Sequence, residues 1–265
     1  MPTQLLTVSR SHYMSPYIKR LYLAGDDLNF TTKQLGLHIK LFFKKPHQKE
    51  LHLPNMINGK VTWPALENRP IARTYSVADF CPINKELAVD FVVHDTSSPA
   101  ASFAYKAESG DQLGMAGPGP KKLHQSDAKA FLFIGDLSAL PAISAIIKQL
   151  PTQTPRTFLF ETPYPQNSKS CLETYFQKDP GFIQIFKQTM QPQEYLLPAL
   201  VAHLAQVNLP DLSVTLAGEH QTVICLKNEL LRQGIPKENL YAVPYWRHNM
   251  NEEVYHAQRH QVIDN

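Results

Sequence analysis

The stretch Ala130–Gly135, with the sequence AFLFIG, is an uninterrupted apolar run that ends at a glycine. A short run of this kind is typical of a strand that is buried on both faces, as in a parallel sheet. Apolar residues then recur at helical spacing, at Leu140, Ile143, Ile147 and Leu150. The sequence therefore predicts a strand followed by a helix, which is the repeating unit of an α/β domain.

The same alternation continues towards the carboxyl terminus. Strands are predicted at residues 157–161, 183–186 and 213–218, and helical patterns occupy residues 194–206 and 221–233. Strands that alternate with helices favour a parallel sheet of the nucleotide-binding type, which binds ligands at the carboxyl ends of its strands. We expect this sheet to form an α/β domain at residues 126–265, with a C-terminal extension.

The first half of the chain has a different pattern. Short segments rich in β-branched and aromatic residues occur at 36–43, 71–77 and 87–94, and clusters of Pro, Gly and Asn separate them. These segments predict strands, and their arrangement favours a small antiparallel β-barrel. Because residues 121–127 form a polar stretch suited to a linker, we place the barrel domain at residues 1–125.

The composition excludes several classes of protein. Of 265 residues, 43% are hydrophobic and only 18% are charged, which is too apolar for a disordered chain. A net charge of +3 argues against nucleic-acid binding through bulk charge. The most apolar long stretch, residues 130–147, is interrupted by Asp136 and Pro141, and the start of the chain does not resemble an export signal. We therefore expect a cytoplasmic protein with no membrane span.

The cysteine spacing and the absence of several motifs argue against some kinds of metal site and some classes of enzyme. Cys81, Cys171 and Cys225 are too few and too dispersed for a disulfide framework, a zinc site or an iron–sulfur cluster. The fingerprints GxGxxG, GxxxxGK[ST], GxSxG and HExxH are absent, which disfavours the dehydrogenases, P-loop enzymes and hydrolases that carry them. We expect no metal site, and any redox chemistry then depends on a bound cofactor.

The strand-like segment Arg73–Ser76, with the sequence RTYS, is the first candidate for such a cofactor site. Arg73 and Tyr75 project to one face of a strand. A guanidinium binds pyrophosphate bidentately and a phenol ring stacks on isoalloxazine, so the pair suits a flavin dinucleotide. A solvated barrel face is the alternative interpretation. Residues 98–105 predict a helix start with Pro99 in the first turn, where free N–H groups bind phosphate.

Seven ordered blocks of sequence, which span nearly the whole chain, resemble a known family. They are RTYS at 73–76, DFVVH at 90–94, SPAASFA at 98–104, GDQLGMAGPG at 110–119, GDLSALPA at 135–142, LAGE at 216–219 and YWR at 245–247. In these blocks the chain resembles siderophore-interacting proteins, flavin-dependent ferric-siderophore reductases related to ferredoxin–NADP reductases. The resemblance implies an FAD-binding antiparallel β-barrel domain followed by an α/β, NAD(P)H-binding-like domain with a parallel sheet.

The resemblance also implies a reaction. NADH, NADPH or a ferredoxin-like donor reduces FAD, and the electrons pass to Fe(III) in a ferric siderophore, which releases Fe(II). No side chain is expected to act as an acid, a base or an iron ligand. The residues that the resemblance assigns to the cofactor are Arg73, Thr74, Tyr75, Ser76, Asp90, His94, Pro99, Ala100, Ala101, Ser102, Phe103, Tyr245, Trp246 and Arg247.

The electron-donor site is expected at strand ends of the α/β domain. Asp136 has a second interpretation as a cap of the following helix, Glu219 as an ordinary acid of a first helical turn, and the YWR block as ordinary packing. The residues assigned to the donor site are Gly135, Asp136, Ser138, Gly218 and Glu219.

Basic residues are expected to attract an anionic ferric chelate, although a solvated surface is the alternative interpretation. The predicted siderophore patch consists of Lys44, Lys45, Lys49, Arg247 and Arg259.

The chain departs from the family pattern at three positions. Ala101 stands where the family commonly has a serine, so one hydrogen bond to phosphate is lost, and Phe103 stands where it commonly has tryptophan. Leu137 replaces the family's acidic residue after Gly-Asp. Two alternative functions stay open: a flavin or ferredoxin-type reductase with another electron acceptor, and a non-enzymatic siderophore-binding module that has lost flavin.

Overall fold

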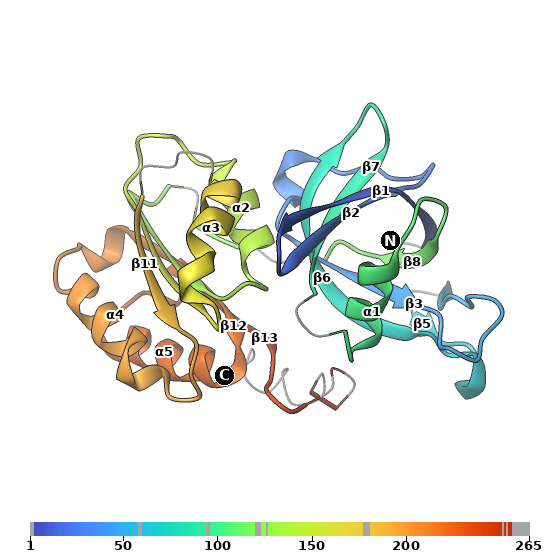
Figure 1. Cartoon of the computed structure of the whole chain (residues 1–265). Helices are drawn as coiled ribbons and strands as arrows, with labels where there is room; N and C mark the ends of the chain where they lie inside the picture. Colours follow the sequence, from blue (N-terminus) through green and yellow to red (C-terminus); the bar gives the residue numbers. More distant parts are fainter. Residues whose placement is uncertain are drawn as a thin grey trace. The chain divides into compact units, whose positions relative to one another are not determined.

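The computed structural model describes residues 3–57, 60–93, 96–119, 123–125, 127–176, 181–250, 252, 254 and 255. The chain divides into two compact units, Met1–Lys121 and Lys122–Asn265. In Figure 1 the first unit runs from blue to green and the second from yellow-green to red. The division lies beside the polar stretch at residues 121–127.

The first unit is a closed antiparallel barrel with the strand order β1-β2-β7-β6-β3-β8, which confirms the predicted architecture. It closes because β8 pairs with both β1 and β3. Alternate residues of each strand fill the interior, as Ile39 and Leu41 of β3 do, and both are fully buried. The strands are β1 (Gln4–Ser15), β2 (Ile18–Ala24), β3 (His38–Phe43), β6 (Ile71–Cys81), β7 (Glu86–Val92) and β8 (Gln112–Ala116).

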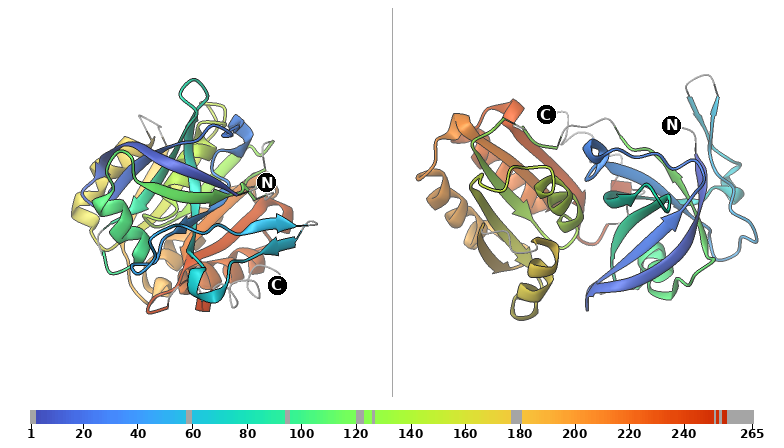
Figure 2. Two further views of the ribbon diagram at one scale, coloured as in Figure 1. Left: turned by 90° about the vertical axis from the view of Figure 1, so that its right-hand side faces the viewer. Right: turned by 90° about the horizontal axis from the view of Figure 1, so that it is seen from above.

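Two further elements accompany the barrel. Helix α1 (Pro99–Lys106) contacts β2, β3 and β7. The strands β4 (Asn55–Ile57) and β5 (Lys60–Thr62) pair only with each other and form a hairpin that projects from the barrel strands in Figure 2. The hairpin was not predicted, because its strands are too short to show a pattern. Short 3-10 helices lie at Thr32–Gln34 and Leu66–Asn68.

The second unit contains a five-stranded sheet with the order β11-β10-β9-β12-β13, and every neighbouring pair is parallel, as predicted. Because the strands are parallel, the carboxyl ends of β9, β10, β12 and β13 lie at one edge of the sheet. The strands are β9 (Ala130–Gly135), β10 (Arg156–Thr162), β11 (Phe182–Lys187), β12 (Leu212–Glu219) and β13 (Leu240–Trp246).

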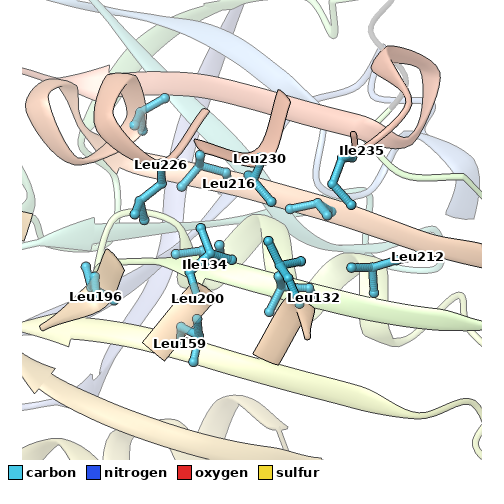
Figure 3. Packing of buried hydrophobic residues seen from close by; sticks show 13 residues of the cluster. Leu132, Ile134, Leu159, Leu196, Leu200, Leu212, Leu216, Leu226, Leu230 and Ile235 are labelled. Carbon is cyan, nitrogen blue, oxygen red and sulfur yellow. The ribbon is translucent and has the colours of Figure 1, made fainter. Parts of the chain in front are cut away.

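Helices cover both faces of β9, which explains its continuous apolar sequence. On one face, α4 (Leu196–Leu204) and α5 (His220–Arg232) contribute leucines that pack against Leu132 and Ile134 (Figure 3). On the other face the rings of Phe133 and Phe158 stack with centroids 5.3 Å apart, and Phe158 stacks at 4.6 Å on Phe176 of α3 (Ser168–Phe176). Helix α2 (Leu140–Ile147) packs against α3.

The sequence patterns did not predict the strands β1, β2 and β13, nor helix α3. The sequence of α3, SKSCLETYF, is mostly polar, and only the tertiary contacts of Cys171, Leu172, Tyr175 and Phe176 bury one side of it. Further 3-10 helices lie at Pro165–Asn167, Pro192–Glu194, Leu209–Asp211 and Lys237–Asn239. Among the described residues, no helix has the length and apolar character needed to cross a bilayer.

Candidate functional site

The RTYS segment lies in the middle of β6, on the wall of the barrel. In the register with β3, Arg73 is opposite Leu41 and Tyr75 is opposite Ile39. Residues that face each other across a strand pair share a face, so Arg73 and Tyr75 lie on the same face as fully buried core residues. Both side chains are nevertheless half-buried, so they are accessible from solvent. Arg73 Nη1 donates a hydrogen bond of 2.8 Å to the carbonyl oxygen of Ala72.

The other two residues of the segment are held from neighbouring elements. Thr74 Oγ1 accepts a hydrogen bond of 2.6 Å from Lys40 Nζ of β3. Ser76 is buried, at 7% exposure. Ser76 is therefore buried in the barrel wall, whereas Arg73, Thr74 and Tyr75 all keep partial exposure.

A chain of aromatic rings connects Tyr75 to helix α1. The Tyr75 ring lies 4.4 Å from that of Phe91 on β7, and Phe91 lies 6.4 Å from Phe43 on β3. Phe43 in turn lies 5.3 Å from Phe103 of α1, in an edge-on geometry. The structure therefore brings three of the predicted segments, β6, β7 and α1, to one region of the barrel.

Helix α1 begins as predicted, with Pro99 in its first turn. Ser98 is the N-cap, and its Oγ accepts the backbone N–H of Ala101 at 3.3 Å. Ala100 and Ala101 are buried, while Ser102 is half-buried. The positive end of the helix dipole at this N-terminus favours an anion such as phosphate.

The resemblance assigns Asp90 and His94 to the cofactor, and the structure describes only the first of them. Asp90 lies on β7 opposite Arg20 of β2. Its two carboxylate oxygens accept hydrogen bonds of 2.6 and 2.8 Å from Arg20 Nε and Nη2. The Asp90 side chain is 1% exposed and that of Arg20 is 12% exposed, so the pair is a nearly buried salt bridge within the barrel wall. His94 lies outside the described residues.

In the second unit, Asp136 occupies the carboxyl end of β9 and is 3% exposed. Its Oδ1 accepts the backbone N–H of Ser138 at 2.8 Å and the Ser138 hydroxyl at 2.5 Å. Its Oδ2 accepts the indole Nε1–H of Trp246 at 2.8 Å. Burial raises the pKa of Asp136, and these hydrogen bonds oppose that shift because they stabilise the ionised carboxylate.

Glu219 occupies the carboxyl end of β12 and is the N-cap of α5. Its Oε2 accepts the backbone N–H groups of Gln221 and Thr222, the latter at 3.3 Å. Its Oε1 accepts the backbone N–H of His248 at 3.2 Å. Glu219 therefore caps α5, in the first turn where one interpretation placed it, whereas Asp136 closes the turn before α2 and does not cap that helix, whose N-cap is Ala139. Both carboxylates also bind the end of β13 or the residues directly after it.

Gly135 and Gly218 allow close approaches at these strand ends. A Cβ atom at Gly135 would lie 2.6 Å from Cβ of Ala139 and 2.7 Å from the carbonyl oxygen of Ala217. Gly218 has a φ of +144°, and a Cβ there would lie 2.7 Å from Oδ2 of Asp136. The Gly-Asp and Gly-Glu pairs of the sequence blocks thus have a direct packing reason.

Glu161 belongs to the same cluster and was not predicted. It lies on β10, is 2% exposed, and its Oε1 accepts a hydrogen bond of 2.9 Å from Thr222 Oγ1. Burial and the negative charge of Asp136 raise the pKa of Glu161 to about 8. The available signal was an acid at the end of an apolar strand, next to the predicted ligand-binding edge.

The YWR block ends β13 and begins the following segment. Tyr245, Trp246 and Arg247 are all half-buried, so their side chains are accessible from solvent. The neighbouring His220 makes a hydrogen bond of 2.9 Å between its Nδ1 and the hydroxyl of the buried Tyr255. Burial lowers the pKa of His220, and the positive charge of Arg247 lowers it further.

Three residues of the predicted siderophore patch lie in one segment of the barrel unit. Lys44 Nζ donates to the carbonyl oxygen of Lys49 at 3.3 Å, and Lys45 Nζ donates to that of Leu66 at 3.2 Å. These three lysines belong to the first unit, whereas Arg247 belongs to the second, and Arg259 lies outside the described residues. Within the described part of the chain, no three His, Cys, Asp or Glu side chains are arranged to hold a metal ion.

The residues of the barrel fit an FAD molecule. Arg73 would offer a half-buried guanidinium to the pyrophosphate, Tyr75 would offer a ring to the isoalloxazine from the same strand face, and the N-terminus of α1 would offer N–H groups to phosphate. The aromatic chain from Tyr75 to Phe103 places these groups in one region.

Comparison with known proteins identifies the same division of the chain. The siderophore-interacting FAD-binding domain matches residues 7–122, and the siderophore-interacting protein family matches residues 128–249. The ferric vibriobactin reductase ViuB of Vibrio cholerae is 35% identical over 267 residues, which cover 98% of this chain and 95% of that protein. An NADPH-dependent ferric-chelate reductase of Escherichia coli is 27% identical over 91% of each chain.

Solved structures agree with these matches. The siderophore-interacting protein SipS from Aeromonas hydrophila superposes with a TM-score of 0.80 and 29% identity, over 100% of this chain and 99% of that one. A ferredoxin NADP+ reductase from Neisseria gonorrhoeae, at 12% identity and a TM-score of 0.59 over 88% of this chain and 92% of that one, shares the fold. Both the predicted fold class and the predicted family resemblance are confirmed. The chain belongs to the siderophore-interacting protein family and carries the family's FAD-binding domain.

Proposed function

We propose that this protein is an FAD-dependent ferric-siderophore reductase, which passes electrons from a reduced nicotinamide through FAD to Fe(III) in a siderophore. Its similarity to relatives named as ferric reductases, over nearly the whole chain in the case of ViuB, supports this proposal. The observation in the structure that carries it is the barrel region where Arg73 and Tyr75 share a strand face and connect to α1 through Phe91 and Phe43.

In this proposal the barrel residues bind and orient the cofactor. The Arg73 guanidinium binds the pyrophosphate, the Tyr75 ring packs on the isoalloxazine, and the first turn of α1 binds phosphate. When bound, FAD supplies the conversion between a two-electron donor and a one-electron acceptor. One NAD(P)H thus reduces two Fe(III) to two Fe(II) and yields NAD(P)+ and a proton. No side chain of the protein has to accept or donate a proton for this balance.

The second unit is the proposed site for the electron donor, because open parallel sheets bind ligands at the carboxyl ends of their strands. The name of the Escherichia coli relative, an NADPH-dependent enzyme, favours NADPH over NADH and over a ferredoxin-like donor. Gly135, Asp136, Ser138, Gly218 and Glu219 shape this edge of the sheet and the turns that follow it, and the two buried acids do so through hydrogen bonds to the protein. We place the protein in the cytoplasm, where a reduced nicotinamide is available.

The substrate is proposed to be a ferric siderophore with anionic oxygen donors. Lys44, Lys45 and Lys49 give the barrel a basic segment that attracts such a chelate, and Arg247 is the proposed contact from the second unit. Fe(III) prefers hard, charged oxygen ligands, and reduction to Fe(II) weakens these bonds. The iron then leaves its chelator without any protein side chain as a ligand.

Absorbance spectroscopy and stopped-flow kinetics test this function. The purified protein, reconstituted with FAD, is expected to show a flavin spectrum that bleaches with NADPH or NADH and recovers when a ferric siderophore is added. A protein that does not retain FAD would favour the siderophore-binding module. A flavoprotein that NAD(P)H reduces, and that other acceptors but no ferric siderophore reoxidise, would favour a reductase with a different acceptor.

A further inference from the structure

The residues Trp246–His248 are the last residue of β13 and the two residues after it, and two buried carboxylates hold them; we call this the anchored segment. Asp136 Oδ2 accepts the indole Nε1–H of Trp246 at 2.8 Å. Glu219 Oε1 accepts the backbone N–H of His248 at 3.2 Å. Because the two anchors bind residues 246 and 248, they lie on either side of Arg247 in the chain.

Each carboxylate divides its two oxygens in the same way. Oδ1 of Asp136 accepts from the backbone and the hydroxyl of Ser138, which closes the turn between β9 and α2. Oε2 of Glu219 accepts from the first N–H groups of α5. One oxygen therefore connects the carboxylate to the sheet edge, and the other binds the anchored segment. An ionised carboxylate suits this role because both of its oxygens are acceptors, whereas an amide offers one acceptor and one donor.

The strand ends are built to admit these two carboxylates. Gly218 has a positive φ of +144°, and any side chain there would collide with Asp136 Oδ2, the oxygen that binds Trp246. The backbone N–H of Glu219 also donates to Asp136, so the two anchors are connected to each other. Gly218, Asp136 and Glu219 are therefore packed together, and the anchored segment binds to the two acids.

Glu161 limits the negative charge of the cluster. Its carboxyl group is buried beside Asp136 and Glu219, and its pKa of about 8 keeps it mostly protonated at pH 7. The positive charge of Arg247 and the neutral His220 face the same cluster, and Thr222 donates to Glu161. Protonation of Glu161 therefore lowers the negative charge that surrounds the two anchors.

We infer that Asp136 and Glu219 are positioning residues, which fix the anchored segment so that the Arg247 guanidinium is presented in one place to the anionic oxygens of the ferric chelate. The chelate as the partner of Arg247 rests on the proposed function. The inference assigns the two acids a role through the anchored segment, because they are 3% and 5% exposed and their oxygens bind protein donors. Direct contact with the electron donor is the competing role.

The first test measures the anchor itself by proton NMR of the FAD-loaded protein. The chain has two tryptophans, Trp63 and Trp246, so Trp63→Phe leaves the Trp246 indole as the sole indole N–H signal. In that background the signal is expected to exchange slowly with water, and Asp136→Asn is expected to accelerate the exchange about tenfold or more. Glu161→Gln is the matched control, because it changes a buried acid of the same cluster that does not bind the segment; its indole signal is expected to stay unchanged at pH 7.

The second test measures reduction of the iron(III) complex of 2,3-dihydroxybenzoate with NADPH as the donor. Arg247→Ala is expected to raise the KM for the chelate about ten- to hundredfold, the range for a lost hydrogen bond to a charged group. Asp136→Asn and Glu219→Gln are expected to raise the same KM with kcat within about twofold, and to add nothing in an Arg247→Ala background. Trp246→Phe removes the same anchor without touching the turn at Ser138, so it replaces Asp136→Asn if that variant does not fold.

Three results would overturn the inference: an unchanged indole signal in Asp136→Asn, effects that multiply with that of Arg247→Ala, or a rise in the KM for NADPH with none for the chelate. The last result would assign the two acids to the donor instead. A wild-type protein that reduces no ferric chelate would reject the proposed function, and the chelate role of Arg247 with it. The indole exchange rates would then still decide whether the anchors exist.

Discussion

The candidate residues of the barrel and those of the sheet edge differ in how deeply they are buried. On β6, Arg73 and Tyr75 are half-buried side chains on a face that continues the barrel core. At the sheet edge, Asp136 and Glu219 are almost completely buried, and protein donors bind both of their oxygens. The comparison teaches that an acid at a strand end can serve its site by holding another segment, whereas Arg73 and Tyr75 keep part of their side-chain surface exposed to solvent.

The largest effect is expected where a predicted cofactor residue proves to be part of the barrel wall. Asp90→Ala leaves the nearly buried Arg20 guanidinium without its bidentate partner. Breaking such a pair costs about 3–5 kcal/mol of unfolding free energy, because an uncompensated charge stays buried. Urea denaturation of the FAD-free protein measures this loss. An FAD-free variant as stable as the wild type, with weakened FAD binding, would instead support the cofactor role.

Arg73→Ala is expected to show the reverse behaviour. Loss of a charged contact to pyrophosphate weakens FAD binding by about 1.5–3 kcal/mol, or roughly ten- to hundredfold in Kd. The stability of the FAD-free protein is expected to change by only about 1 kcal/mol, the typical effect of a point substitution, because Arg73 is half-buried. Flavin retention during dialysis and a thermal melt of the FAD-free protein measure the two effects. Unchanged retention would remove Arg73 from the cofactor site.

Glu161 gives the stability of the sheet edge a pH dependence. Its pKa in the folded protein is raised from 4.5 to about 8, so the folded state binds more protons than the unfolded state between these values. The stabilisation is complete below pH 4.5 and is lost as pH rises towards 8, with a slope of at most about 1.4 kcal/mol per pH unit. Glu161→Gln is expected to flatten this dependence and to raise stability at pH 8.

Urea denaturation at several pH values between 5 and 8 measures this effect in the wild type and in Glu161→Gln. Asp136, whose pKa is also raised by burial, contributes in the same direction, so the difference between the two proteins is the relevant quantity. Parallel stability curves for the two proteins would contradict a protonated Glu161.

The smallest effect is expected from the basic segment of the barrel. Replacement of Lys44, Lys45 and Lys49 by Gln is expected to slow reduction of anionic ferric chelates severalfold at low salt, and to have little effect at high salt, because exposed charges act over a screened distance. Stopped-flow rates at two ionic strengths measure this change. Equal rates for variant and wild type at low salt would show that the segment does not guide the substrate.

Local sequence patterns were sufficient to predict features that depend on a single strand. The apolar run at Ala130–Gly135 predicted β9 with its observed bounds, and the alternation at residues 71–77 predicted the shared face of Arg73 and Tyr75. They failed for α3, whose polar sequence gains a buried side only from its neighbours, and for Glu161, whose raised pKa needs the burial that other elements create.

The sequence by itself determined the order of the two folds, the strand that carries Arg73 and Tyr75, and the family, because strand period and ordered motifs are properties of neighbouring residues. Only the tertiary structure decided which distant side chains form hydrogen bonds and ion pairs with each other. Asp90 meets Arg20 across 70 residues, and Asp136 meets Trp246 across 110. Such bonds form because the pairing of strands in the closed barrel and in the parallel sheet brings together residues that are far apart in the sequence. A local pattern of apolar and polar residues carries no information about that pairing.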